Sequence, residues 1–317
     1  MRKWLKIIPI LLLLTGGVVV CIVRWQAWFG MPAEPVWTGE TLDYTFINPG
    51  LDSTAMQHIN ADSTLTILVL GDIHNRLQRD DYDTLAARVP QANMIAQAGD
   101  WIDRGQKYYY QLLLREWCAS ALDSMPVISC PGNHEYNKGL EKTVSTIWVK
   151  AFPHPRNGPN DVPGESYFVD LPQLRFICID TNPMVRMVNI TRTLNWLHRT
   201  MDDAKGKFIV IMMHHPILSV GKGRFNSLIY AAFRRVSNQA DLVIAGHDHS
   251  YMRYRNLVVI NAAGRPKPQK MHVTPDKIDP EPTYSVITLR DSLRRFEFKT
   301  YHLSDGEAID SLYVVHE

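Results

Sequence analysis

The chain contains 317 residues, of which 45% are hydrophobic and 21% are charged, and this is the composition of an ordinary globular protein. Its formal net charge is only +2, and residues 1–30 hold four basic residues and no acidic one, so the rest of the chain is close to neutral. The charge balance therefore excludes the strongly basic surface that is typical of nucleic-acid-binding proteins.

The first 30 residues have the pattern of a membrane anchor. Three basic residues precede an almost continuous apolar run over residues 7–23, which Arg24 and Trp25 close. Such a run is near the length of a membrane-spanning helix, and the preceding positive charge keeps the N-terminus on the cytoplasmic side. We therefore expect an N-terminal hydrophobic anchor helix, with the rest of the chain exported to the periplasmic or extracellular side. A cleaved signal peptide is the alternative, because its basic and apolar regions have the same pattern.

Residues 31–63 are predicted to be a linker with a lead-in strand, and residues 64–317 to form the main domain. In this domain, apolar runs of strand length alternate with helical segments, which is typical of an α/β fold with buried sheets. Strands are predicted at 64–70, 93–98, 126–130, 166–171, 174–180, 207–213, 241–245 and 257–261. Helices are predicted at 107–122, 138–150, 191–203 and 226–237.

The last part of the chain has a different character. Residues 265–283 are rich in proline and charge, so they are predicted to form a long surface loop. The segments 284–290, 294–303 and 309–316 then read as strands with no helix between them, which predicts an antiparallel set.

Five of the apolar runs end in short polar clusters that contain metal-binding residue types. The clusters are GDIH (71–74), GDWIDRG (99–105), GNHE (132–135), HHP (214–216) and GHDH (246–249). Taken alone, each has a simpler structural explanation, such as a helix N-cap for Asp72 or a turn for Gly-Asn-His. Ligands of open α/β sheets, however, bind beyond the carboxyl ends of the strands, so five such clusters predict one shared site.

The clusters supply more oxygen and nitrogen ligands than a single zinc ion takes. The candidate ligands are Asp72, His74, Asp100, Asn133, His214, His247 and His249. This number suits two metal ions about 3.5–4 Å apart with one carboxylate between them. Mixed imidazole and carboxylate ligation favours manganese, iron or zinc over magnesium or calcium.

In their order and spacing, these motifs resemble the calcineurin-like metallophosphoesterase superfamily, from about Thr64 to the end of the chain. The resemblance implies a βαβα sandwich of two mixed sheets flanked by helices. It also implies hydrolysis of phosphate esters, by in-line attack of a hydroxide that bridges two divalent metal ions.

The same resemblance assigns the candidate ligands to the two metal ions. It implies that one metal is held by Asp72, His74 and His249. It implies that the second is held by Asn133, His214 and His247, with Asp100 between the two. In the HHP motif, the histidine two residues before the proline is the implied ligand, and His215 is then expected to face the substrate.

Further residues receive expected roles. The resemblance implies that His134 stabilises the developing charge or protonates the leaving oxygen, that Asp103 orients His134, and that Arg104 contacts a phosphate oxygen. Tyr136 and Arg253 lie near the motifs and are expected to contact the substrate together with His215.

At two positions the chain differs from particular branches of this superfamily. Purple acid phosphatases have a tyrosine at the position of Asp103, and Ser/Thr protein phosphatases lack the second histidine of GHDH. The residues leave the substrate open among monoesters, diesters, pyrophosphates and phosphoproteins, and they indicate no protein partner. The alternative function is a membrane-anchored, non-catalytic binding module with a vestigial metal site.

Overall fold

The computed structural model describes residues 35–39, 64–138, 141–152, 154–159, 165–204, 206–218, 227–265, 274–290 and 295–315. Residues 39–317 form one unit, and residues 1–38 form another. The predicted anchor and most of the predicted linker lie outside the described residues. Within those described ranges, no helix combines the length and the apolar character needed to span a bilayer.

The first sheet has six strands. They are β1 (Thr64–Leu70), β2 (Met94–Gln97), β3 (Val127–Ser129), β11 (Thr283–Arg290), β12 (Arg295–His302) and β13 (Ala308–Val315). Their order across the sheet is β13-β12-β11-β1-β2-β3. The strands β1, β2 and β3 are parallel, whereas β11, β12 and β13 are antiparallel, as predicted for the end of the chain.

The second sheet has seven strands. They are β4 (Tyr167–Asp170), β5 (Leu174–Ile179), β6 (Phe208–Met213), β7 (Leu242–Ala245), β8 (Tyr251–Tyr254), β9 (Leu257–Val259) and β10 (Lys277–Asp279). Their order is β10-β8-β9-β7-β6-β5-β4. The strands β5, β6, β7 and β9 are parallel, and the other pairings are antiparallel. The prediction of an α/β fold with two mixed sheets is therefore confirmed.

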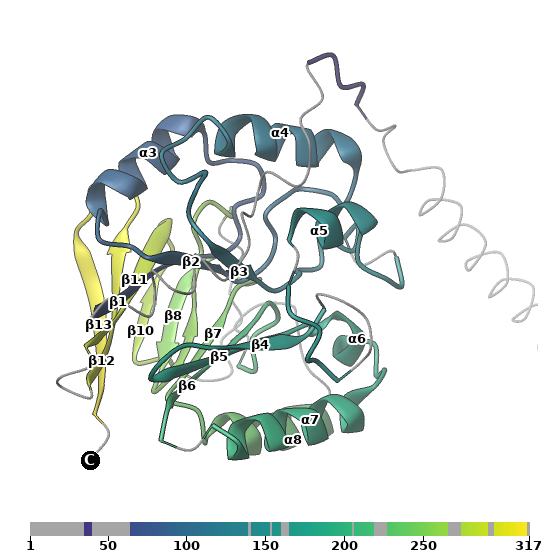
Figure 1. Ribbon diagram of the computed structural model, residues 1–317, viewed down its shortest axis with the longest axis vertical. Coiled ribbons are helices and arrows are strands. Elements are labelled where there is room, and N and C mark those ends of the chain that lie inside the picture. The colour runs from purple at the N-terminus through teal and green to yellow at the C-terminus, as the bar shows by residue number, and fades with distance from the viewer. Residues whose placement is uncertain are drawn as a thin grey trace, which may run out of the picture. The chain divides into compact units, whose positions relative to one another are not determined.

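Helices cover the outer faces of both sheets. The helices are α3 (Arg79–Arg88), α4 (Lys107–Trp117), α5 (Thr146–Ala151), α6 (Asn182–Val185), α7 (Ile190–Asp202) and α8 (Ser227–Ser237). Residues of α3, α4 and α5 share a buried cluster with the six-stranded sheet, and residues of α6, α7 and α8 share one with the seven-stranded sheet. Figure 1 shows α3 and α4 on one side of the two sheets and α7 and α8 on the other.

Alternation along β1 explains this layering. Ile67 and Val69 face the second sheet, in the core between the sheets, whereas Leu68 and Leu70 face the helices. Both faces of β1 are apolar from Ile67 to Leu70, and the polar residues of GDIH follow directly after the strand. Polar residues at such strand ends are therefore free to build a site.

Some elements differ from their predictions. Helix α5 begins only at Thr146 instead of residue 138, because Asn137 and Lys138 have left-handed backbone angles that a helix cannot continue. Helix α3 was not predicted, since its sequence RDDYDTLAAR buries only two residues. Strand β10 lies in the predicted loop 265–283, and its pairing with β8 is a long-range contact that local pattern does not reveal.

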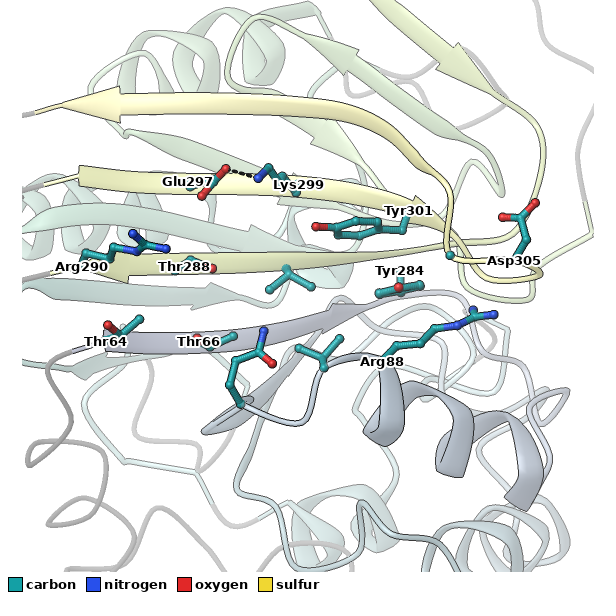
Figure 2. A pocket seen from close by; sticks show the side chains of 14 residues that line it. Thr64, Thr66, Arg88, Tyr284, Thr288, Arg290, Glu297, Lys299, Tyr301 and Asp305 are labelled. Carbon is teal, nitrogen blue, oxygen red and sulfur yellow. Dashed lines mark ion pairs between the residues drawn. The ribbon is translucent and has the colours of Figure 1, made fainter.

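A groove of about 510 Å³ lies on the helix-bearing face of the six-stranded sheet, beside the end of α3. Figure 2 shows Tyr284 and Tyr301 near its centre, and their rings stack with centroids 5.1 Å apart. Lys299 and Glu297 form an ion pair on β12 along its wall. None of the five polar clusters contributes a residue to this groove.

Candidate metal centre

The five polar clusters meet at one edge of the sandwich, beyond the carboxyl ends of the parallel strands. The backbone N–H of Asp72, after β1, donates to the carbonyl of Gly99, after β2, at 3.1 Å. The Asp72 Oδ1 atom accepts a hydrogen bond of 3.0 Å from the backbone N–H of His247, after β7. The strand ends of both sheets are therefore tied together, as the sequence pattern predicted.

Five of the seven candidate ligands have a left-handed backbone conformation. Their φ angles are 53° for Asp72, 53° for His74, 58° for Asp100, 74° for His247 and 54° for His249. Such angles cost non-glycine residues on the order of 1–3 kcal/mol each, and they cluster at functional sites where the surrounding structure enforces them. Five of the eleven non-glycine residues with a positive φ in the described ranges are therefore candidate ligands at this edge.

The first ligand group consists of Asp72, His74 and His249. The Nε2 atoms of His74 and His249 lie 3.0 Å apart, and they are 3.9 and 3.8 Å from Asp72 Oδ1. On its other side, the His249 ring contacts the carbonyl of Arg265 through Nδ1 at 2.8 Å. That contact directs Nε2 of His249 toward the group.

The second ligand group consists of Asn133, His214 and His247. Asn133 Oδ1 lies 3.1 Å from His214 Nε2 and 3.0 Å from His247 Nδ1, and these two nitrogens are 3.3 Å apart. His214 contacts the carbonyl of Ala98 through Nδ1 at 2.9 Å, which fixes the direction of its ring.

Asp100 lies between the two groups. Its Oδ2 atom is 3.5 Å from His74 Nε2 in the first group and 3.2 Å from His214 Nε2 in the second. Burial alone would raise the pKa of Asp100, but the His214 and His134 rings hold it well below its usual value. Burial alone would likewise lower the pKa of His214, but the Asp100 carboxylate raises it to about 9.

These contacts bring together lone-pair atoms of carboxylates, an amide and imidazoles. Asp72, His74, Asp100 and His249 each place one such atom within 4.8 Å of the others, and His214, His215 and His247 form a second set. Buried oxygen and nitrogen atoms that converge in this way are suited to hold a metal ion. The residues present therefore fit a pair of divalent metal ions.

His134 lies beside the ligand groups, with 17% of its side chain exposed. Its Nδ1 atom is 2.7 Å from the backbone carbonyl of Asp103, and its Nε2 atom is 3.9 Å from Asp100 Oδ2. Burial lowers the pKa of His134 to about 4. The neutral ring therefore carries its proton on Nδ1, where the carbonyl accepts it.

Asp103 contacts His134 through its backbone carbonyl and not through its carboxylate. The Asp103 carboxylate lies 3.3 Å from His74 Nδ1 instead. Arg104 is half-buried in the same loop, and its backbone carbonyl accepts a hydrogen bond from Gln106.

Of the three predicted substrate-binding residues, only His215 lies at the centre. Its ring centroid is 4.6 Å from that of His247, and its Nδ1 atom is 2.8 Å from Thr181 Oγ1. The structure gives the other two residues different contacts, which correct the expectation from sequence proximity.

Tyr136 is only 1% exposed, and its hydroxyl donates to the Asp180 carboxylate. Arg253, on β8, donates to Asp310 at 2.6 Å and to Asp276 at 3.1 Å. The Tyr136 hydroxyl and the Arg253 guanidinium therefore both form contacts within the fold.

Glu135 was quoted in the GNHE motif but received no role, and the structure gives it one. This fully buried carboxylate accepts backbone hydrogen bonds from Asp100 (2.9 Å), Trp101 (2.9 Å) and Gly132 (2.7 Å). It thereby ties the loop after β2 to the loop after β3. In the sequence, the feature that indicates this role is an acidic residue directly after Asn133 and His134 in the same motif.

A sixth strand end also contributes to the centre. After β5, Asn182 donates to the carbonyl of Gly132 at 3.3 Å, and Thr181 contacts His215. Asp180 accepts from the backbone N–H and the side chain of Asn182, both at 2.9 Å. In the sequence, this strand end is indicated by the run LRFICID, an apolar strand followed by a polar residue, as in the five clusters.

Comparison with known proteins agrees with this geometry. The family model for the calcineurin-like phosphoesterases matches residues 65–251. A search of curated proteins found no match.

Among solved structures, a purple acid phosphatase from yellow lupin (Lupinus luteus) seeds superposes with a TM-score of 0.61 at 14% identity. The match covers 81% of this chain but only 54% of the lupin chain. GAP50, described as the anchor in the inner membrane complex of Plasmodium, superposes with a TM-score of 0.56 at 16% identity, over 80% of this chain and 89% of its own. These two likenesses show the fold, and the family match identifies the chain as a member of the calcineurin-like phosphoesterase family.

Proposed function

We propose that this protein is a metal-dependent phosphoesterase that hydrolyses phosphate esters. The observation that carries the proposal is the convergence of seven metal-binding side chains from both sheets on one strained edge. Family membership supports a hydrolase of this class.

In this proposal, Asp72, His74 and His249 would hold one divalent ion, Asn133, His214 and His247 would hold the other, and Asp100 would contribute to both sites. The ions would be manganese, iron or zinc, because the ligands mix imidazole with oxygen. When bound, such a pair neutralises phosphate charge and lowers the pKa of water to supply a nucleophile.

The chain's own residues then position the substrate and move a proton. His134 has its Nδ1 proton held by the Asp103 carbonyl, so Nε2 is the atom that gains and loses a proton. Directed at the leaving oxygen of a phosphate ester, it would act as the general acid. Arg104, from the adjacent loop, would donate charge-assisted hydrogen bonds to a phosphate oxygen.

The alternative of a non-catalytic binding module is not favoured. A vestigial site is expected to lose ligands, and all seven ligand positions keep side chains that bind metals. The GAP50 likeness shows nevertheless that this fold is found in a protein described as an anchor, so the fold alone does not decide the matter. Attachment to a membrane through residues 1–30, with the domain on the exported side, stays a proposal from the sequence.

The test is metal analysis and a hydrolysis assay on the full-length chain in detergent. We expect close to two metal ions per chain after reconstitution with manganese, iron or zinc, and turnover of a phosphate monoester or diester that a chelator abolishes. A folded chain that binds no metal and hydrolyses neither ester would overturn the proposal in favour of the binding module.

A further inference from the structure

One loop residue, Asp103, contacts two histidines of the centre with different atoms. Its backbone carbonyl is 2.7 Å from His134 Nδ1, and its carboxylate Oδ1 is 3.3 Å from His74 Nδ1. The two histidine rings lie next to each other, with centroids 4.4 Å apart. A single residue therefore reaches both the candidate general acid and a candidate metal ligand.

The backbone of Asp103 is held independently of its carboxylate. Its N–H donates to Asn75 Oδ1 at 2.9 Å. Asn75 in turn donates to the carbonyl of Trp101 at 3.0 Å through its backbone and to the carbonyl of Tyr109 at 2.8 Å through its side chain. Removing the carboxylate should therefore leave the carbonyl that faces His134 in place.

The carboxylate lies on the side of the His74 ring opposite the ligand group. His74 presents Nε2 to His249 and Asp100, at 3.0 and 3.5 Å, and Nδ1 to Asp103. A histidine that binds a metal commonly donates its other ring N–H to a carboxylate, which fixes the tautomer and makes the ligand nitrogen more basic. Asp103 Oδ1 lies at ion-pair distance from His74 Nδ1, 3.3 Å, on the side of the ring where such a carboxylate lies, although the two atoms do not have hydrogen-bond geometry in this structure.

We propose that the Asp103 carboxylate positions His74 for metal binding, and that His134 is oriented by the Asp103 backbone alone. This inference rests on the proposed function, and it reassigns the carboxylate from the proton-transfer step to the first metal site. It predicts that the side chain of Asp103 and the ring of His134 act independently.

The experiment compares full-length wild type with Asp103→Ala, Asp103→Asn, His134→Ala and the Asp103→Ala/His134→Ala double variant. The matched control is Asp83→Ala, because Asp83 on α3 is a paired carboxylate of similar exposure, 38% against 40% for Asp103. Manganese binding is titrated by calorimetry without substrate, thermal melting verifies the fold, and kcat/KM is measured at saturating manganese over a range of pH.

We expect Asp103→Ala to weaken one of two manganese equivalents about 10- to 100-fold, as is usual when the partner of a ligating histidine is lost. Asp103→Asn should restore part of this loss, because its amide oxygen can accept the Nδ1 proton. His134→Ala and Asp83→Ala should bind both equivalents normally. The pH profile of Asp103→Ala should keep the shape of wild type, and its loss of kcat/KM should multiply with that of His134→Ala.

The opposite pattern would overturn the inference. In that case Asp103→Ala binds both manganese ions as wild type does, its pH profile matches that of His134→Ala, and the double variant is no slower than either single one. Because the titration needs no substrate, wild type that binds two ions but hydrolyses no ester refutes the proposed activity while still testing Asp103. Wild type that binds no metal refutes both.

Discussion

The metal centre and the groove beside α3 both carry polar and charged side chains, but they differ in residue types and in geometry. In the groove, Lys299 pairs with Glu297, and Arg88 donates to the carbonyls of Leu303 and Ser304 at 2.6 and 3.0 Å. These three charged side chains of the groove are thus paired with neighbouring groups. At the metal centre, oxygen and nitrogen ligand atoms from several loops lie close together, in a set suited to hold a cation.

The backbone explains the difference. Groove residues lie opposite each other on registered antiparallel strands, such as Tyr284 with Tyr301 and Thr288 with Glu297, so their side chains stand side by side. The centre is built on loops after parallel strands, where left-handed residues turn the side chains toward one point. A functional site in this molecule is marked by convergence and strain, and not by the size of a cavity.

The largest loss of turnover among the test substitutions is expected at Asp100. Asp100→Asn removes charge from a side chain whose Oδ2 lies within 3.5 Å of a histidine nitrogen in each ligand group. We expect turnover to fall by far more than the roughly 100-fold typical of a supporting residue, while the fold is kept. Hydrolysis assays and circular dichroism measure the two properties, and near-normal turnover would show that Asp100 is not shared between metals.

His134→Ala should give the next largest effect. The general acid contributes about 10²- to 10⁴-fold to such a rate, but its imidazole is not a predicted ligand. We therefore expect a large loss of kcat with both metals retained. Metal analysis of the purified variant provides the control, and loss of both metals would mean that His134 is a ligand.

Glu135→Gln tests the clamp behind the ligands. The new NH2 group cannot accept a hydrogen bond, so either the N–H of Trp101 or the N–H groups of Asp100 and Gly132 lose their acceptor, depending on which oxygen it replaces. We expect about 1–3 kcal/mol less stability in denaturant unfolding and weaker metal binding. If stability and metal affinity both match wild type, the clamp does not hold the loops.

The Gly132→Ala substitution is expected to have an effect of similar size on stability, through a different cause. An added Cβ would lie 2.1 Å from Asp100 Oδ1 and 2.5 Å from Asp100 N, so the loops must separate. We expect a loss of about 1–3 kcal/mol in stability together with weaker metal binding. The control is Gly206→Ala, where an added Cβ meets nothing within 4 Å and the strain comes instead from a left-handed φ of 77°. It should lose stability alone.

The smallest effect is expected in the groove. Lys299→Ala removes one half of a surface ion pair, so stability should change by less than about 1 kcal/mol and turnover of a phosphate ester should not change. A marked loss of turnover in this variant would mean that the groove belongs to the functional site, and would end the contrast drawn above.

Local pattern sufficed for the elements that are buried on both faces. The apolar runs of β1, β5 and β6 were predicted within one residue at each end, because a strand with no polar face is interrupted only where it leaves the sheet. Strand β10 and helix α3 escaped prediction because long-range packing, and not their own hydrophobic pattern, stabilises them.

The sequence by itself determined the candidate ligands of this protein, because each one follows an apolar strand in a motif that is rare as a set. Only the tertiary structure decided how the remaining side chains are used. It turned Arg253 toward Asp310, buried Tyr136 against Asp180, and placed the Asp103 carboxylate at His74. Such choices depend on contacts between residues far apart in the chain, and the direction of a side chain in a loop is fixed by those contacts and not by its neighbours in sequence.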